Sequence, residues 1–227
     1  GNFRSGVQRH GHRYYYVDFK TEPKHNVEIA DIFVQFNIYN PYRHYNRLNK
    51  KLAYQYILNS NKPFLVCEEG AFRQFPNYKR WGWYNYKNSL GIFNNKNVDN
   101  SRWREFKRKN NLEIKDWSSK GDYILIMAQI EYDSALIEMY DQGYKSFLEY
   151  ATKLIQEIRK YTDRPILFRP HPNDPQKKFN SLLKFSNVEI SENFSNDNFF
   201  VKNGGEGLQK DFDRSYCVIT FNSNSSV

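Results

Sequence analysis

Short apolar runs alternate along the chain with segments in which apolar residues recur at helical spacing. In the first half, Ile29–Ile38 is strand-like, Arg47–Leu58 has helical periodicity, and Phe64–Cys67 is a continuous apolar run. The order strand, helix, strand predicts a βαβ unit, and an apolar run without alternation is typical of a buried parallel strand. Residues 1–26 are polar and basic and predict a solvated arm, in which the aromatic run Tyr14–Val17 predicts an edge strand.

The second half repeats the alternation and predicts a parallel, Rossmann-like sheet. An amphipathic helix follows Gly143, with Phe147, Leu148, Ala151, Leu154, Ile155 and Ile158 on one face. The other predicted elements are strands at Tyr123–Ala128, Pro165–Phe168, Val188–Ile190 and Tyr216–Phe221, a short segment at Leu182–Phe185 and a helix-like stretch at Gly207–Ser215. The chain ends soon after the last strand, so we expect this domain to lack its final elements.

A change of composition separates the two halves. Ser101–Asn110 is strongly basic and predicts a helical or irregular segment, and the polar stretch Asp116–Gly121 is typical of a linker. We therefore predict an α/β protein of two Rossmann-like domains, residues 1–117 and 118–227, the second one truncated at its carboxyl end.

Composition and charge narrow the class of partner. Hydrophobic residues make up 39% of the chain and aromatic residues 18%, so the core is expected to depend on Tyr, Phe and Trp. The 34 Lys and Arg residues against 25 Asp and Glu residues give a net charge of +9. Such a charge favours nucleotides, nucleic acid, acidic glycans or an anionic membrane surface, and it does not choose among them.

The cysteines and the N-terminus predict a cytoplasmic location. Cys67 and Cys217 each lie in an apolar run without a second thiol at metal-ligand spacing, which predicts buried free thiols in a reducing compartment. No run approaches the length of a membrane span, and the N-terminus lacks the apolar segment of a signal peptide. Three histidines of the polar arm, two of them in the run HGH at residues 10–12, make a metal site conceivable. That run has no carboxylate or thiol beside it, so a solvated arm is the stronger interpretation and no metal site is predicted.

A histidine lies between two prolines directly after the predicted strand that ends at Phe168. Pro170 and Pro172 push Arg169 and His171 toward extended backbone, so no helix can form there. In parallel α/β sheets, ligands bind beyond the carboxyl ends of the strands, which makes a titratable side chain at this point a candidate. A rigid loop with a surface histidine is an equally good interpretation of this motif alone.

Polar side chains follow three strands of the second half and are expected to meet in one crevice. The serine-rich turn after the last predicted strand offers hydroxyls and free backbone N–H groups, which favour an anion such as phosphate. An ordinary helix N-cap, however, needs only one serine. For Asp133 alone, a solvated helix start is the stronger interpretation. The residues that should converge are Gln129, Asp133 and Ser134, then Arg169 and His171, then Thr220, Asn222, Ser223, Ser225 and Ser226.

The first half contributes two adjacent acids at the end of its second strand. Glu68 and Glu69 precede Gly70, and because neighbours in a strand point to opposite faces, one of the two is expected to reach a cleft. The aromatic and basic stretch that follows, residues 71–86, could stack a sugar or a base, but packing over a thin core accounts for most of it. The sequence has no dinucleotide-binding glycine motif, P-loop, zinc spacing or nucleophile elbow.

Four short motifs, in order, resemble those of the capsular polysaccharide biosynthesis glycosyltransferases, in particular the retaining β-Kdo transferases. They are CEEGAFR, AQIEYDSA, FRPHP and TFNSNSS, and they span roughly Phe64–Val227. The resemblance implies a GT-B architecture of two Rossmann-like domains and a CMP-activated Kdo sugar as donor and co-substrate, with no further cofactor. Glu69 and Ala71 depart from the family's pattern, so the donor is less firmly implied than the fold.

Carried over residue by residue, the resemblance implies that Asp133 is a nucleophile and that one acid of the Glu68–Glu69 pair, more readily Glu68, assists the acceptor hydroxyl. His171 and the serines after Thr220 would hold the nucleotide phosphate. Two carboxylates on opposite walls of a cleft suit double displacement with retention.

We therefore expect a retaining glycosyltransferase that moves a Kdo-like acidic sugar from CMP to a growing capsular or lipopolysaccharide glycan. The expected partners are the donor, a glycan or glycolipid acceptor and, peripherally, the inner face of the membrane. Nucleic acid is not expected as a partner in that function. The alternatives are a transferase of the same fold with another nucleotide sugar, or a non-catalytic basic module that binds nucleic acid.

Overall fold

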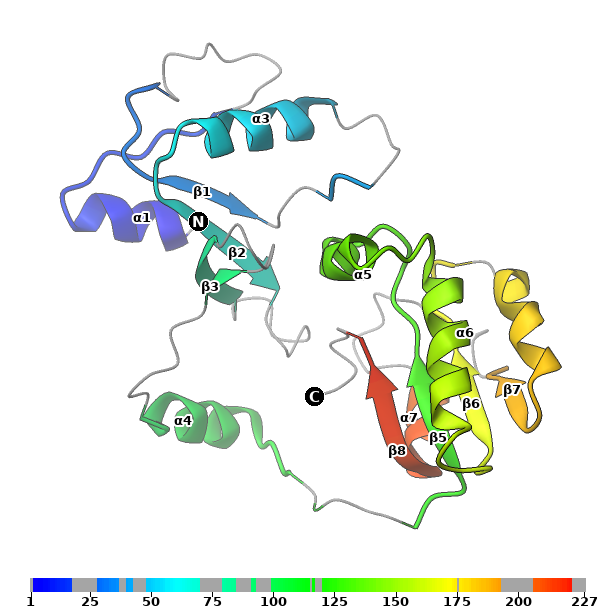
Figure 1. The fold of residues 1–227 in the computed structure, drawn as a ribbon. Coiled ribbons are helices and arrows are strands. Elements are labelled where there is room, and N and C mark those ends of the chain that lie inside the picture. Colours follow the sequence, from blue (N-terminus) through cyan, green and yellow to red (C-terminus); the bar gives the residue numbers. More distant parts are fainter. Residues whose placement is uncertain are drawn as a thin grey trace. The chain divides into compact units, whose positions relative to one another are not determined.

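The computed structural model describes residues 2–17, 28–36, 40–42, 48–69, 79–84, 91–92, 99–114, 116, 120–174, 176–192 and 206–221. The chain divides into two compact units, one of Gly1–Glu68 and Trp81–Ile92 and the other of Glu69–Arg80 and Phe93–Val227. The observed division at Phe93 precedes the predicted boundary at 117/118. Each unit has its own sheet (Figure 1).

The N-terminal unit contains the predicted βαβ pattern. Strand β1 (Phe33–Phe36) pairs in parallel with β2 (Phe64–Glu69), in a register that joins Phe33 to Phe64 and Phe36 to Cys67. Helix α3 (Leu48–Asn59) connects these strands and buries Ala53 and Ile57. Strands β3 (Lys79–Tyr84) and β4 (Gly91–Ile92) pair antiparallel and complete the sheet in the order β1-β2-β3-β4.

Two predictions for the start of the chain are wrong. The structure has helix α1 at Asn2–Arg9, where the sequence predicted a solvated arm, and Tyr14–Val17 is irregular, where it predicted an edge strand. Aromatic packing explains the difference, because the Phe3 ring stacks on Trp81 at 4.7 Å and meets Tyr14 edge-on at 6.5 Å. These ring contacts hold the segment against β3 without a strand ladder. Strand β1 is also shorter than predicted and begins only at Phe33.

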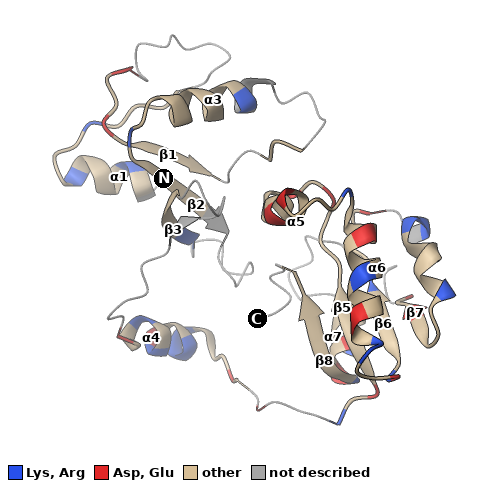
Figure 2. Ribbon diagram, in the orientation of Figure 1, with Lys and Arg blue, Asp and Glu red and all other residues tan. Residues whose placement is uncertain are grey.

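The C-terminal unit contains a fully parallel sheet, as predicted. Its strands are β5 (Tyr123–Met127), β6 (Ile166–Arg169), β7 (Val188–Ile190) and β8 (Ser215–Thr220), in the spatial order β7-β6-β5-β8. Counted along the chain, the strands of this sheet therefore lie in the order 3-2-1-4, which matches the first four positions of the six-stranded doubly wound order 3-2-1-4-5-6. Before this sheet in the chain, Ser101–Asn110 forms helix α4, whose charged residues are mostly Lys and Arg (Figure 2).

Helices cover both faces of this sheet. Helix α6 (Phe147–Ile158) lies across one face and α7 (Glu206–Asp213) behind the other (Figure 1). Ser146 caps α6 by accepting the Glu149 N–H at 3.1 Å, and Phe147, Ala151 and Ile155, four residues apart, are buried. The remaining connections are the 3₁₀ helix η1 (Ser134–Leu136), helix α5 (Ile137–Asp141) and the 3₁₀ helix η2 (Gln176–Lys184).

The central strand β5 is buried on both faces, which explains its unbroken apolar sequence. Ile124, Leu125, Ile126 and Met127 are all buried, and each such side chain contributes about 1.5–3 kcal/mol when fully buried. Neither Cys67 nor Cys217 forms a disulfide; Cys67 is buried, as predicted, whereas Cys217 is only half-buried. Within the described ranges, no helix is both long enough and apolar enough to cross a bilayer.

Candidate functional site

The carboxyl ends of three strands lie side by side in the C-terminal unit. Met127 at the end of β5 is in register with Arg169 of β6 on one side and with Thr220 of β8 on the other. The chain order of the strands reverses between β5 and β8, and in parallel α/β sheets ligands bind at such a switch point. The loops that the sequence expected to converge therefore begin at adjacent positions of one sheet edge.

Asp133 is the N-cap of η1, six residues beyond the end of β5. Its Oδ1 atom accepts the Ala135 N–H at 2.9 Å, its carbonyl accepts the Leu136 N–H at 3.0 Å, and its side chain is half-buried. The helix-start interpretation is thus correct.

The residue before Asp133 has a left-handed backbone. Tyr132 has φ of 60°, a conformation that costs roughly 1–2 kcal/mol for a residue with a β-carbon. Its ring stacks on Tyr140 of α5 at 5.8 Å and 8° between ring planes, and its N–H donates to the Tyr140 hydroxyl at 3.3 Å. Strained backbone that the surrounding structure holds in place is typical of functional sites.

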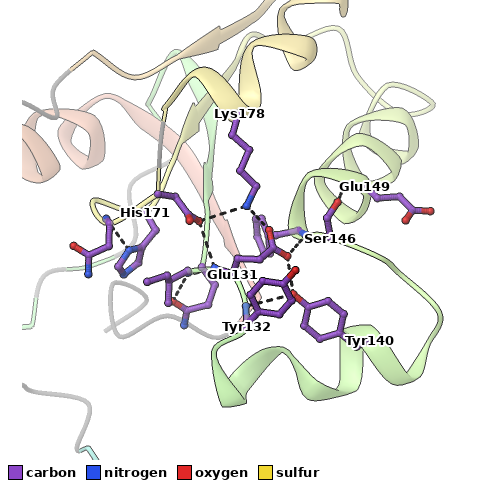
Figure 3. A network of polar contacts seen from close by, with 12 residues as sticks. Glu131, Tyr132, Tyr140, Ser146, Glu149, His171 and Lys178 are labelled. Atoms are coloured by element: carbon purple, nitrogen blue, oxygen red, sulfur yellow. Dashed lines mark hydrogen bonds and ion pairs between the residues drawn. The ribbon is translucent and has the colours of Figure 1, made fainter. Parts of the chain in front are cut away.

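Glu131 is the centre of a polar network that joins four elements (Figure 3). Its Oε1 atom accepts the Tyr140 hydroxyl at 2.6 Å and the Phe147 N–H, at the start of α6, at 2.9 Å. Its Oε2 atom forms an ion pair with Lys178 of η2. The carboxylate therefore satisfies a free N–H at a helix N-terminus, where negative charge is also favoured by the helix dipole.

Asp174 connects the same network to the loop after β6. Its Oδ2 atom accepts the Glu131 N–H at 3.4 Å and lies 3.9 Å from Lys178 Nζ. Burial raises the pKa of Asp174 although Lys178 opposes that shift. Burial and the hydrogen bond to Glu131 also raise the pKa of Tyr140, so its hydroxyl stays a donor to Glu131 well above neutral pH.

His171 lies in the turn that Asp174 closes. Its Nδ1 atom accepts the Asn173 N–H at 3.1 Å, and its carbonyl accepts the Asp174 N–H at 2.9 Å. A neutral imidazole that accepts at Nδ1 carries its proton on Nε2. The ring is half-buried in this turn.

Arg169 differs from its predicted environment. The sequence expected a guanidinium at the mouth of the crevice, whereas the side chain is 3% exposed and its Nη1 atom lies 2.6 Å from Asp211 of α7. Ser191 donates to the same carboxylate oxygen at 2.6 Å. This guanidinium is neutralised inside the unit.

The other predicted site residues are placed only in part. Gln129 is half-buried and its Oε1 atom accepts the Ile130 N–H at 3.0 Å, while Ser134 begins η1. The Thr220 hydroxyl oxygen is buried and has no hydrogen-bond partner among the described residues. Ser223, Ser225 and Ser226 lie outside the described residues, as do the side chains of Glu68 and Glu69 at the end of β2.

Sequence reasoning missed the residues that organise the site, namely Glu131, Tyr140, Asp174 and Lys178. Glu131 is 43 positions from Asp174 and 47 from Lys178, so no local pattern could pair them. The one usable signal was an acid two residues before the candidate nucleophile, at the start of a predicted helix. A groove of about 1160 Å³ lined by residues such as Tyr123, Glu189 and Asp213 includes none of this network.

Over the described ranges, no group of three or more His, Cys, Asp or Glu residues is arranged to hold a metal ion. No family model, curated protein or solved structure matches the chain at a significant level.

Proposed function

We propose that this protein is a retaining glycosyltransferase that moves a Kdo-like acidic sugar from a CMP-activated donor to a capsular or lipopolysaccharide glycan. The observation that carries the proposal is the half-buried Asp133 beyond the central strand, at the switch point of a parallel sheet. The left-handed Tyr132 before it adds support, because strain of this kind is a sign of function. The four ordered motifs supply the family and the donor.

In the proposed reaction, an oxygen of Asp133 bonds to the anomeric carbon of the donor while the bond from that carbon to the CMP phosphate oxygen breaks. The acceptor hydroxyl then attacks the same carbon, Glu68 or Glu69 takes its proton, and the Asp133 carboxylate leaves. Two inversions give net retention. The Glu pair belongs to a second Rossmann-like domain in a GT-B architecture, which is part of the proposal.

The proposed donor contacts come from the three strand ends. His171 donates from Nε2 to the phosphate, and Gln129, Ser134, Thr220 and the serines beyond it bind the rest of the nucleotide. Among the described residues the buried Thr220 hydroxyl has no hydrogen-bond partner, which supports this assignment because a buried polar group of this kind requires an explanation. Arg169 acts indirectly, because Asp211 already occupies its guanidinium. The acceptor would be met at the cytoplasmic face of the membrane.

Intact-protein mass spectrometry tests the proposal. Glu68→Gln incubated with CMP-Kdo should trap an adduct of the mass of one Kdo residue, because the second step lacks its base. The control is the double variant Glu68→Gln/Asp133→Asn, which keeps the side-chain volume and loses the nucleophile. An adduct that persists in the double variant, or no adduct and no transfer in any variant, contradicts the proposed mechanism.

A second candidate function, nucleic-acid binding, is favoured by one surface of the N-terminal unit. Trp81 and Tyr15 are 39% and 41% exposed, and Arg4 and Arg13 lie over the rings of Tyr14 and Tyr15, each 6.0 Å from the ring centroid. Aromatic rings with arginines suit stacked bases. Filter binding across a salt series distinguishes the two functions, because phosphate-backbone binding falls steeply with salt and free CMP does not compete.

A further inference from the structure

We propose that Glu131, Lys178 and Asp174 form a brace that fixes the loop of Asp133 against the loop of His171, with Glu131 and Lys178 acting as positioning residues. This inference rests on the proposed function, because the two loops carry the proposed nucleophile, Asp133, and His171, the proposed hydrogen-bond donor to the phosphate. The proposed mechanism gives these three residues no direct contact with the donor. They act through the backbone that they hold.

The brace is built around one carboxylate and one ammonium group. Glu131 receives the Tyr140 hydroxyl, the Phe147 N–H and the Lys178 ammonium, and its own N–H donates to Asp174. Lys178 lies near both acids, 3.9 Å from Asp174 and in direct contact with Glu131 (Figure 3). One residue of η2 therefore ties the connection after β5 to the connection after β6.

Burial distinguishes this ion pair from the surface pairs of the same unit. The side chains of Glu131 and Asp174 are 11% and 10% exposed and that of Lys178 is 27% exposed. The pair of Lys160 and Glu157 is 64% and 53% exposed. Water screens the exposed pair, so only the partly buried one is expected to hold backbone in place.

The brace acts on Asp133 through Tyr132. Glu131 is fixed on one side and the η1 cap on the other, so the left-handed Tyr132 between them has no freedom to relax. On the other loop, Asp174 is held by the Glu131 N–H and donates its own N–H to the His171 carbonyl at 2.9 Å. Releasing Lys178 should therefore loosen both loops together.

The test uses Lys178→Met, which removes the cation, and Lys178→Arg, which keeps it. Lys160→Met, in the exposed pair, is the matched control. The first readout is amide hydrogen exchange at Glu131, Ala135 and Asp174, whose N–H groups all donate within the two loops. The second is transfer from CMP-Kdo, as kcat and KM separately.

In Lys178→Met, we expect exchange to rise at these three amides and not in β5, and kcat to fall on the order of 10²-fold, the effect of slight misplacement of a reacting group. KM should change much less, and Lys178→Arg should restore most of kcat. Lys160→Met should match the wild type. If Lys178→Met does not fold, Tyr140→Phe, which removes one bond to Glu131, should raise exchange at the same amides.

The outcomes separate the brace from the proposed function. If amide exchange rises in Lys178→Met but the wild type does not transfer Kdo, the result supports the brace and contradicts the proposed transferase function. An active wild type whose kcat survives in Lys178→Met overturns the positioning role. Unchanged exchange at the three amides overturns the brace itself.

Discussion

The Nη1 atom of Arg169 lies 2.6 Å from Oδ2 of Asp211 inside the C-terminal unit, and the two side chains are 3% and 1% exposed. The pair joins the end of β6 to α7, and Ser191, just after β7, donates to the same oxygen. Two opposite charges can be buried together only when each satisfies the other, so the loss of one leaves the other without solvation.

Asp211→Asn should lower the free energy of unfolding by about 3–5 kcal/mol, because the buried Arg169 guanidinium loses its counter-charge. Urea denaturation measures the change. The matched control is Asp122→Asn, which breaks the exposed pair with Arg214 and should leave the denaturation midpoint nearly unchanged. Equal shifts in the two variants would mean that burial does not set the strength of the Arg169 pair.

Replacements of Asp133 should separate its role as a cap from its role in chemistry. Asp133→Asn keeps an oxygen that accepts the Ala135 N–H, so stability should be unchanged, since Asn caps helices as well as Asp. Asp133→Ala should cost about 1 kcal/mol through loss of the cap. Both should abolish transfer. If Asp133→Asn still transferred sugar, Asp133 would have only its helix-capping role and no role as nucleophile.

The raised pKa of Asp174 predicts a particular pH dependence of stability. The native state binds the Asp174 proton more tightly than the unfolded chain does, so protonated Asp174 raises the free energy of unfolding. This contribution is fully present below the unfolded pKa, about 3.9, and is lost as pH rises through the raised native pKa. Wild-type stability should therefore fall relative to Asp174→Asn over this window.

Urea denaturation of the two proteins across the acid range checks the trend. Glu157→Gln provides a control of opposite sign, because a hydrogen bond from Lys160 lowers the pKa of the exposed Glu157. Relative to that variant, the wild type should gain stability as pH rises. A difference between wild type and Asp174→Asn that does not vary with pH contradicts the prediction.

Local patterns predicted the parallel sheet and α6 because their signals are contained in single segments. The run at Tyr123–Met127 is apolar on both faces, and Phe147, Ala151 and Ile155 recur every four residues, so burial and period agree. The α1 helix was missed because ring contacts with Trp81, far along the chain, stabilise it.

The candidate site could be predicted only as far as its strand ends. Sequence order places Asp133, His171 and Thr220 after neighbouring strands, but it contains no information on which charges pair across the loops. Arg169 was therefore predicted to face a ligand when it faces Asp211, and the Glu131–Lys178 pair was not predicted at all. Both interactions join elements that only the folded sheet brings together.

Two glycines of the C-terminal unit should respond differently to alanine. A β-carbon on Gly121 would lie 2.0 Å from the backbone carbon of Ser215, at the point where β5 and β8 begin, and backbone cannot move aside cheaply. Gly143 has φ of 93° and open space around it, and it ends α5 by donating its N–H to the Tyr140 carbonyl at 2.9 Å. Gly121→Ala should cost about 3 kcal/mol through overpacking, and Gly143→Ala about 1 kcal/mol through backbone strain alone. Thermal unfolding of both variants under one condition gives the order, and a Gly121→Ala protein as stable as Gly143→Ala would show that the two strands do not approach this closely.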